Sequence, residues 1–114
     1  MEIKTLSNDF AVTAQIDVTD IPAIKKAGFK ALICNRPDDE APDQPSFAAI
    51  KAAAETAGLQ AVNIPIVPGE MGESHIATFE EAMNELPLPV LGYCRSGGRA
   101  TTLWTASAAS QVAV

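Results

Sequence analysis

Short apolar segments that favour β-strands alternate with segments of helical spacing along most of this 114-residue chain. Strands joined in this way run parallel, and the connecting helices cover both faces of the sheet. The sequence therefore predicts a single α/β domain over residues 1–114, a small three-layer sandwich around a parallel sheet. Strands are predicted at 29–34, 60–66 and 89–93, with a β-prone piece at 10–13. Helices are predicted near 19–27 and 46–57, after Glu73 with apolar positions from Ile76 to Leu86, and from Ala100 onward.

The charge of the chain limits its partners. A formal net charge of −6 argues against general nucleic-acid binding. No stretch approaches the about 20 apolar residues of a membrane span, and the first residues lack a signal-peptide core, so a cytoplasmic location is expected. Residues 94–114 contain two arginines and no acidic residue, which indicates a small anionic substrate rather than a nucleic acid or a membrane.

The two cysteines, Cys34 and Cys94, are far apart in the chain. A structural disulfide is disfavoured without a secretory signal. One histidine and two dispersed cysteines match no metal-ligand spacing, so we expect neither a metal nor another cofactor. Cys34 is expected to pack in the core, with a redox or resolving role as the alternative.

The segment 90–101 reads as a strand, a glycine-containing loop and the start of a helix. Backbone N–H groups of such a loop point inward, and the helix N-terminus favours negative charge. We predict that Cys94 is a thiolate nucleophile in this loop and that Arg99 binds the anion above it. The anion-binding loop between them consists of Arg95, Ser96, Gly97 and Gly98.

Several motifs occur together in the order seen in one family. They are Gln15, the triplet at 27–29, the Asn-Arg-Pro-Asp-x-Glu run at 35–40, Ile-Pro-Ile at 64–66 and Tyr-Cys-Arg-Ser-Gly-x-Arg at 93–99. In this the chain resembles the phosphatase-like domain first described in the beta-lactamase-hydrolase-like proteins. The resemblance implies a tyrosine-phosphatase-like fold with the active loop between the last strand and the last helix, with Cys94 as nucleophile and Arg99 as anion-binding residue. Some members of the family look like phosphatases, and others resemble sulfurtransferases.

Two positions depart from the family pattern. Gly98 stands where a threonine or similar residue is usual, and Ala100 replaces the serine or threonine that usually follows the arginine. In phosphatases that hydroxyl helps the thiolate to leave, so its loss weakens the case for a phosphocysteine intermediate.

Loop length and the acid supply favour sulfur chemistry. Tyrosine phosphatases use C-x5-R, whereas this chain has C-x4-R, as in rhodanese-type sulfurtransferases, and the tighter ring suits a terminal persulfide sulfur. A phosphatase also needs a general acid, and the loop at 67–73 offers Glu70 and Glu73 but no aspartate. Sulfur transfer from thiosulfate or a persulfide needs no such acid, because its leaving groups are stable anions or thiolates.

The sequence leaves three candidate functions. The first is a sulfurtransferase that carries sulfane sulfur on Cys94 and passes it to a thiol acceptor such as glutathione. The second is a phosphate-monoester hydrolase working through a phosphocysteine, with Glu70 or Glu73 as the acid. The third is a non-catalytic module that binds anions. In all three, Arg36, Asp38 and Glu40 either line the rim of the site or form a surface ion-pair loop.

Overall fold

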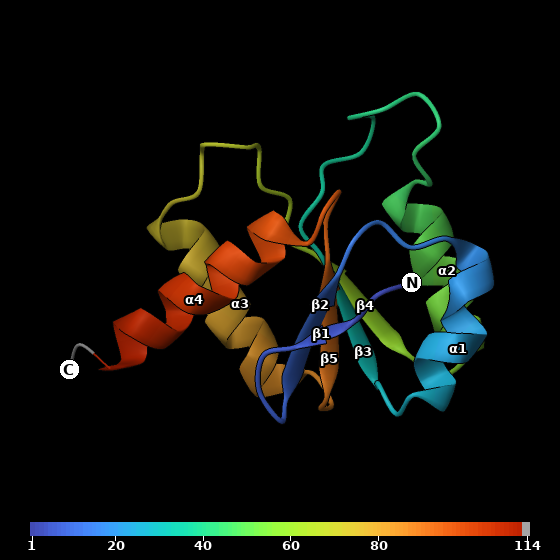
Figure 1. Cartoon of the computed structure of the whole chain (residues 1–114), viewed down its shortest axis with the longest axis horizontal. Coiled ribbons are helices and arrows are strands. Elements are labelled where there is room, and N and C mark those ends of the chain that lie inside the picture. The colour runs from blue at the N-terminus through green and yellow to red at the C-terminus, as the bar shows by residue number, and fades with distance from the viewer. Residues whose placement is uncertain (113–114) are drawn as a thin grey trace.

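The computed structural model describes residues 1–112 as an α/β domain with one sheet (Figure 1). Among these residues no helix combines the length and the apolar character needed to cross a membrane. The elements are β1 (Lys4–Thr5), β2 (Phe10–Thr13), the 3₁₀ turn η1 (Val18–Asp20), α1 (Ile21–Lys26), β3 (Ala31–Cys34), α2 (Phe47–Thr56), β4 (Gln60–Asn63), α3 (Glu73–Glu85), β5 (Val90–Tyr93) and α4 (Gly98–Val112).

The sheet has the strand order β1-β2-β5-β3-β4. The four longer strands are parallel, as predicted, and β5 lies in the middle between β2 and β3. The sequence did not predict β1, which pairs antiparallel with β2. Its two residues are exposed, so they carry no alternation of apolar and polar side chains.

Helices cover both faces of the sheet, which confirms the three-layer sandwich (Figure 1). Side chains alternate along each strand, so Leu32 enters the core beneath α1 and α2 while Ile33 enters the core beneath α3 and α4. On the central strand β5, Leu91 enters the core beneath α1 and α2, and Val90 enters the core beneath α3 and α4. The three inner strands β2, β3 and β5 are buried throughout, as expected for a parallel sheet covered on both sides, whereas the edge strand β4 is only partly buried.

Helix ends follow local chemistry. Ser46 caps α2 by accepting a hydrogen bond from the Ala49 N–H at 3.2 Å, as predicted. Gly28 and Gly58 follow α1 and α2 with φ of 102° and 89°, a conformation that glycine adopts without steric cost.

Two of the predicted boundaries that adjoin the site were wrong. The strand predicted to reach residue 66 ends at Asn63, because its partner β3 ends opposite at Cys34 and Pro65 has no N–H to donate. Ile64 and Ile66 remain buried, in the core beneath α3 and α4. The last helix starts at Gly98 rather than at Ala100, so the C-terminal part of the predicted loop belongs to α4.

Gly92 on the central strand makes room for α4 and for the Phe10 ring. A Cβ atom at this position would lie 2.5 Å from Phe10 Cζ and 3.5 Å from Ala100 Cβ. We expect Gly92→Ala to lower the free energy of unfolding by about 1–3 kcal/mol, measured by denaturant titration. Gly72→Ala is the matched control, because a Cβ there meets no atom within 4 Å. Equal stabilities for the two variants would contradict this packing.

Candidate active site

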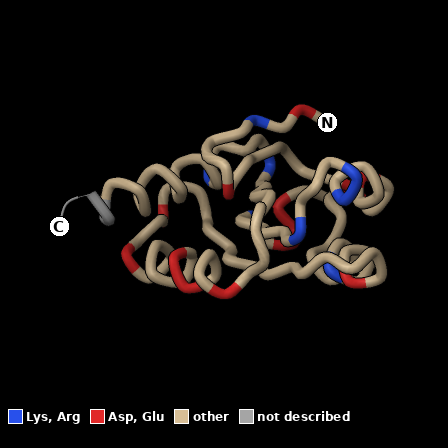
Figure 2. The backbone as a smooth tube through the Cα atoms, turned by 90° about the horizontal axis from the view of Figure 1, so that it is seen from below, with Lys and Arg blue, Asp and Glu red and all other residues tan. Residues whose placement is uncertain are grey.

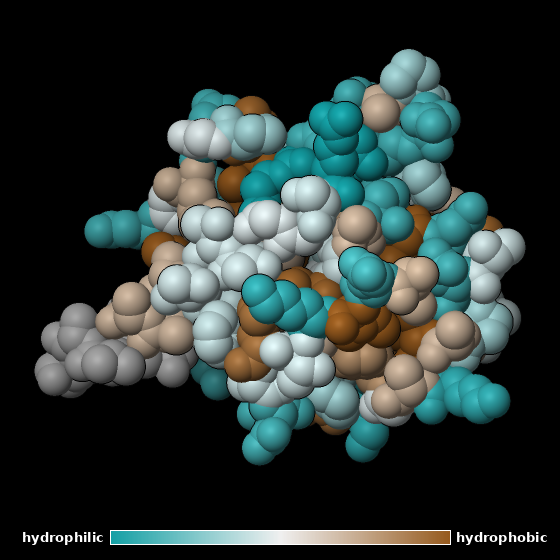
Figure 3. Space-filling model, in the orientation of Figure 1, coloured by the Kyte–Doolittle hydropathy of each residue, from teal (hydrophilic) through white to brown (hydrophobic). Residues whose placement is uncertain are grey.

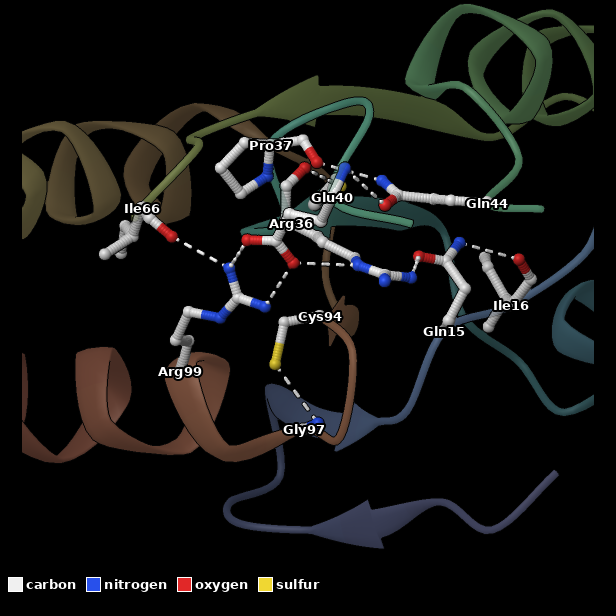
Figure 4. A network of polar contacts seen from close by, with 11 residues as sticks. Gln15, Ile16, Arg36, Pro37, Glu40, Gln44, Ile66, Cys94, Gly97 and Arg99 are labelled. Carbon is white, nitrogen blue, oxygen red and sulfur yellow. Dashed lines mark hydrogen bonds and ion pairs between the residues drawn. The ribbon is translucent and has the colours of Figure 1, made fainter. Parts of the chain in front are cut away.

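Cys94 follows the central strand β5 directly, at the edge of the sheet where the parallel strands end. This is where ligands bind in open parallel sheets. Cys94 is fully buried, and its Sγ accepts a hydrogen bond from the Gly97 N–H at 3.1 Å (Figure 4). The loops after β3 and β4 rise on either side of this edge, and hydrophilic side chains cover the space between them in Figure 3.

The loop from 94 to 99 owes its shape to glycine and to hydroxyl groups. Gly97 has a φ of 90°, and a Cβ there would lie 3.4 Å from the Thr13 carbonyl group. Ser96 Oγ accepts a hydrogen bond from the Gly98 N–H at 3.2 Å. The Gln15 N–H donates to the Arg95 carbonyl oxygen at 3.3 Å, which ties the loop to the segment after β2. The left-handed residue that the turn requires is thus Gly97, and the unusual glycine at 98 serves as the first residue of α4.

Glu40 fixes the guanidinium group of Arg99. Arg99 donates from Nη1 to Glu40 Oε2 at 2.6 Å and from Nη2 to Glu40 Oε1 at 2.8 Å, and Nη1 also donates to the Ile66 carbonyl oxygen at 2.9 Å. A guanidinium has five N–H donors, so three are engaged here and two remain, on Nε and Nη2. The bond to Glu40 raises the pKa of Arg99, and the neighbouring Cys94 sulfur raises it further. Arg99 therefore lies beside the Cys94 thiol with a donor pair left for an anion.

The same carboxylate binds a second arginine. Arg36, which is almost fully buried, donates from Nε to Glu40 Oε1 at 2.9 Å. Its Nη1 donates to Gln15 Oε1 at 3.2 Å, and Gln15 in turn donates from Nε2 to the Ile16 carbonyl oxygen. The network seen in Figure 4 thus connects the segments that follow β2, β3 and β4 with the start of α4. Both arginines hold the pKa of Glu40 below its ordinary value of 4.5, and the hydrogen bond from Arg99 contributes most to this shift.

The other predicted rim residues lie outside this network. Asp38 Oδ1 accepts a hydrogen bond from the Phe47 N–H at 2.9 Å and so helps to cap α2. Glu70 and Glu73 are exposed, in the loop after β4 and at the start of α3, and the structure shows no side-chain hydrogen bond or ion pair for either within residues 1–112. Arg95 is exposed as well.

Two contributors to the site could not be recognised as such from the sequence. Gln15 matched the family pattern, but its role as the acceptor for Arg36 depends on a contact across 21 positions. The Ile66 carbonyl oxygen is a backbone atom and leaves no signature in residue type. No group of three or more potential metal ligands occurs within the described residues.

The charge distribution around the loop is uneven. After Arg99, α4 contains no charged residue, and it is neutral over most of its length in Figure 2. All three arginines of the chain, Arg36, Arg95 and Arg99, come from segments that follow strands at this edge. Arginine suits planar, bidentate binding of oxyanions better than lysine does. The arrangement can therefore hold a small anion over a buried thiol.

The pairing of Glu40 predicts a dependence of stability on pH. A carboxyl group whose folded-state pKa is depressed stabilises the fold above its unfolded pKa, and this contribution is lost as pH falls through the folded pKa. Wild type should therefore melt at a higher temperature than Glu40→Gln near neutral pH, and the difference should shrink as the pH falls below about 4.5. Melting curves of both variants over this range test it. A difference independent of pH would contradict the pairing.

The fold and its cysteine loop define a phosphatase-like α/β domain. The structure of Tk-PTP in its active form superposes with a TM-score of 0.60 over 83% of this chain and 63% of that one, at 19% identity, which supports the predicted tyrosine-phosphatase-like fold. A crystal structure of a candidate phosphatase from Neisseria meningitidis Z2491 is more similar, with a TM-score of 0.85 and 35% identity over 91% of this chain and 74% of that one.

The sequence profile of the beta-lactamase hydrolase-like protein, phosphatase-like domain, matches residues 2–111. The chain belongs to this family. The beta-lactamase hydrolase-like protein of Agrobacterium fabrum is 34% identical over 104 residues, which cover 91% of this chain and 24% of that protein. The chain thus spans about a quarter of the length of the curated relatives that it matches.

Proposed function

We propose that the protein is a cysteine-dependent sulfurtransferase that carries sulfane sulfur as a persulfide on Cys94. The observation that carries this proposal is the state of the nearby carboxylates. Glu40 is the carboxylate bound to Arg99, and it is ionised and shared between two arginines. Asp38 is engaged in capping α2. A site so arranged is poorly supplied with a proton for an alkoxide or phenoxide leaving group.

Sulfur transfer does not need a general acid to protonate the leaving group. The Cys94 thiolate attacks the outer sulfur of thiosulfate or of a persulfide, the S–S bond of the donor breaks, and sulfite or a thiolate leaves with the electron pair. The donor pair of Arg99 and the loop N–H groups would stabilise the charge on the donor and on the resulting persulfide. An acceptor thiolate such as glutathione then attacks the outer sulfur and releases the Cys94 thiolate.

Intact-protein mass spectrometry tests this function. Cys34→Ala, which leaves Cys94 as the single cysteine, should gain the mass of one sulfur atom when it is treated with thiosulfate or a low-molecular-weight persulfide, and a reducing thiol should remove it. Cys94→Ser should gain nothing. Absence of an adduct in Cys34→Ala from several donors would refute the proposal.

Phosphate-monoester hydrolysis is the second candidate, favoured by the phosphatase description of the 35% identical Neisseria structure. In that case Glu70 or Glu73 would have to move to the thiol as the acid. Wild type would then hydrolyse an aryl phosphate, vanadate would inhibit it and Cys94→Ser would be inactive. If neither chemistry is found while an oxyanion still raises the melting temperature, the remaining function is anion binding without catalysis.

A further inference from the structure

Cys34 lies close to the candidate nucleophile in the sheet. It is the last residue of β3, and its register partner on β5 is Tyr93, the residue before Cys94. Pairing continues one residue further, because the Asn35 N–H donates to the Tyr93 carbonyl oxygen at 2.8 Å. Strands about 4.8 Å apart with a rise of about 3.3 Å per residue place the Cα atoms of Cys34 and Cys94 about 6 Å apart. Disulfides join Cα atoms at about 4.4–6.8 Å. Cys34 and Tyr93 lie on the same face of the sheet, so the side chain of Cys94 has to turn towards that face for the two sulfurs to meet.

The surroundings of Cys34 keep it a neutral thiol at rest. Cys34 is 3% exposed, and its Sγ donates to the Arg36 carbonyl oxygen at 3.3 Å, on the loop that carries Glu40. Burial raises the pKa of Cys34, against smaller opposite effects of the neighbouring Tyr93 hydroxyl and of the Arg36 backbone. Cys34 is therefore a poor competitor for an external sulfur donor but a proton-bearing thiol next to the site.

We infer that Cys34 is the second thiol of the site and resolves a persulfide on Cys94 into a Cys34–Cys94 disulfide. This inference rests on the proposed function. The proton of Cys34 passes to the outer sulfur of the Cys94 persulfide, and the resulting Cys34 thiolate attacks the inner sulfur. The S–S bond of the persulfide breaks, and the outer sulfur leaves as hydrosulfide with that proton. The outer sulfur is reduced to sulfide and the two cysteines are oxidised to the disulfide, so no further oxidant is needed. The Cys94 side chain must leave the Gly97 N–H for this bond to form.

As a consequence, an external acceptor thiol and Cys34 compete for the persulfide on Cys94. When an acceptor thiol is abundant, it takes the outer sulfur and the enzyme turns over. When acceptor is scarce, Cys34 discharges the persulfide as sulfide and the disulfide blocks the nucleophile until a thiol reductant reopens it. Both cysteines are free in the structure, as this cycle requires of the resting state.

The test uses one equivalent of thiosulfate, which releases sulfite and no acceptor thiol. It is followed by alkylation under denaturing conditions, intact-mass measurement and sulfide trapping. Wild type should release about one sulfide per chain in excess of donor decay and lose both alkylatable thiols, whereas Cys34→Ala should keep the sulfur adduct and release at least about tenfold less sulfide. Cys34→Ser is the second variant, in case the alanine destabilises the core.

The outcomes separate the two claims. Persistence of the persulfide in wild type as in Cys34→Ala would overturn the resolving role and leave sulfur transfer intact. Absence of the adduct from both proteins would refute the sulfurtransferase function and this inference with it. A disulfide that joins two chains, detected by its mass under non-reducing conditions, would also overturn the intrachain role.

Discussion

Cys94→Ser should lose sulfur transfer to thiol acceptors almost completely, with kcat/KM reduced by about a thousandfold or more. The oxygen of a serine hydroxyl at this position would accept the same hydrogen bond from the Gly97 N–H that Cys94 Sγ accepts. Geometry is thus preserved, but a hydroxyl is essentially not ionised at neutral pH and cannot form a persulfide. The measurement is the steady-state rate with thiosulfate or a persulfide as donor and glutathione as acceptor.

The control for this variant is the other buried cysteine. Cys34→Ser makes the same atomic change at a site of similar burial, and it should retain turnover when acceptor is in excess. A melting curve with added thiosulfate distinguishes loss of chemistry from loss of binding, because Cys94→Ser should still be stabilised by the anion. Equal residual activity in both serine variants would show that the thiol of Cys94 is not the nucleophile.

The sequence was most informative where structure is local. The cap at Ser46, the left-handed glycine at 58 and the strand–loop–helix order around Cys94 depend on neighbours within a few positions, and all three are present. Strand ends were less predictable. The end of β4 at Asn63 depends on where β3 ends, which is a property of the pairing and not of the segment 60–66 itself.

The partners of the anion-binding residues were beyond local inference. The sequence pattern left Asp38 and Glu40 equivalent as rim residues, yet the structure gives them different roles. Glu40 meets Arg99 across 59 positions, whereas Asp38 reaches the N-terminus of α2. Which carboxylate finds an arginine depends on how the 35–46 loop crosses the sheet edge, and charge patterning in one sequence does not contain that information.

Arg99→Lys should lower kcat about 100- to 1000-fold while changing KM for the donor much less. Lysine keeps the positive charge but offers a single ammonium in place of the planar fork. It can replace neither the two-point contact with Glu40 nor the free donor pair on Nε and Nη2. Loss of one well-placed donor to a developing negative charge typically costs about 2.7–4 kcal/mol in the transition state.

Comparison with Glu40→Gln separates the two functions of this arginine. The amide oxygen and nitrogen of glutamine cannot both accept from Arg99, so the guanidinium loses its fixed orientation but keeps all its donors. A misplaced group costs less than a missing one, and we expect a loss of about ten- to a hundredfold in kcat for Glu40→Gln. Glu55→Gln, an exposed change on α2 that alters the net charge by the same amount, is the control. If Arg99→Lys instead raised KM and left kcat unchanged, Arg99 would bind substrate and transition state equally, and its role would be anion capture alone.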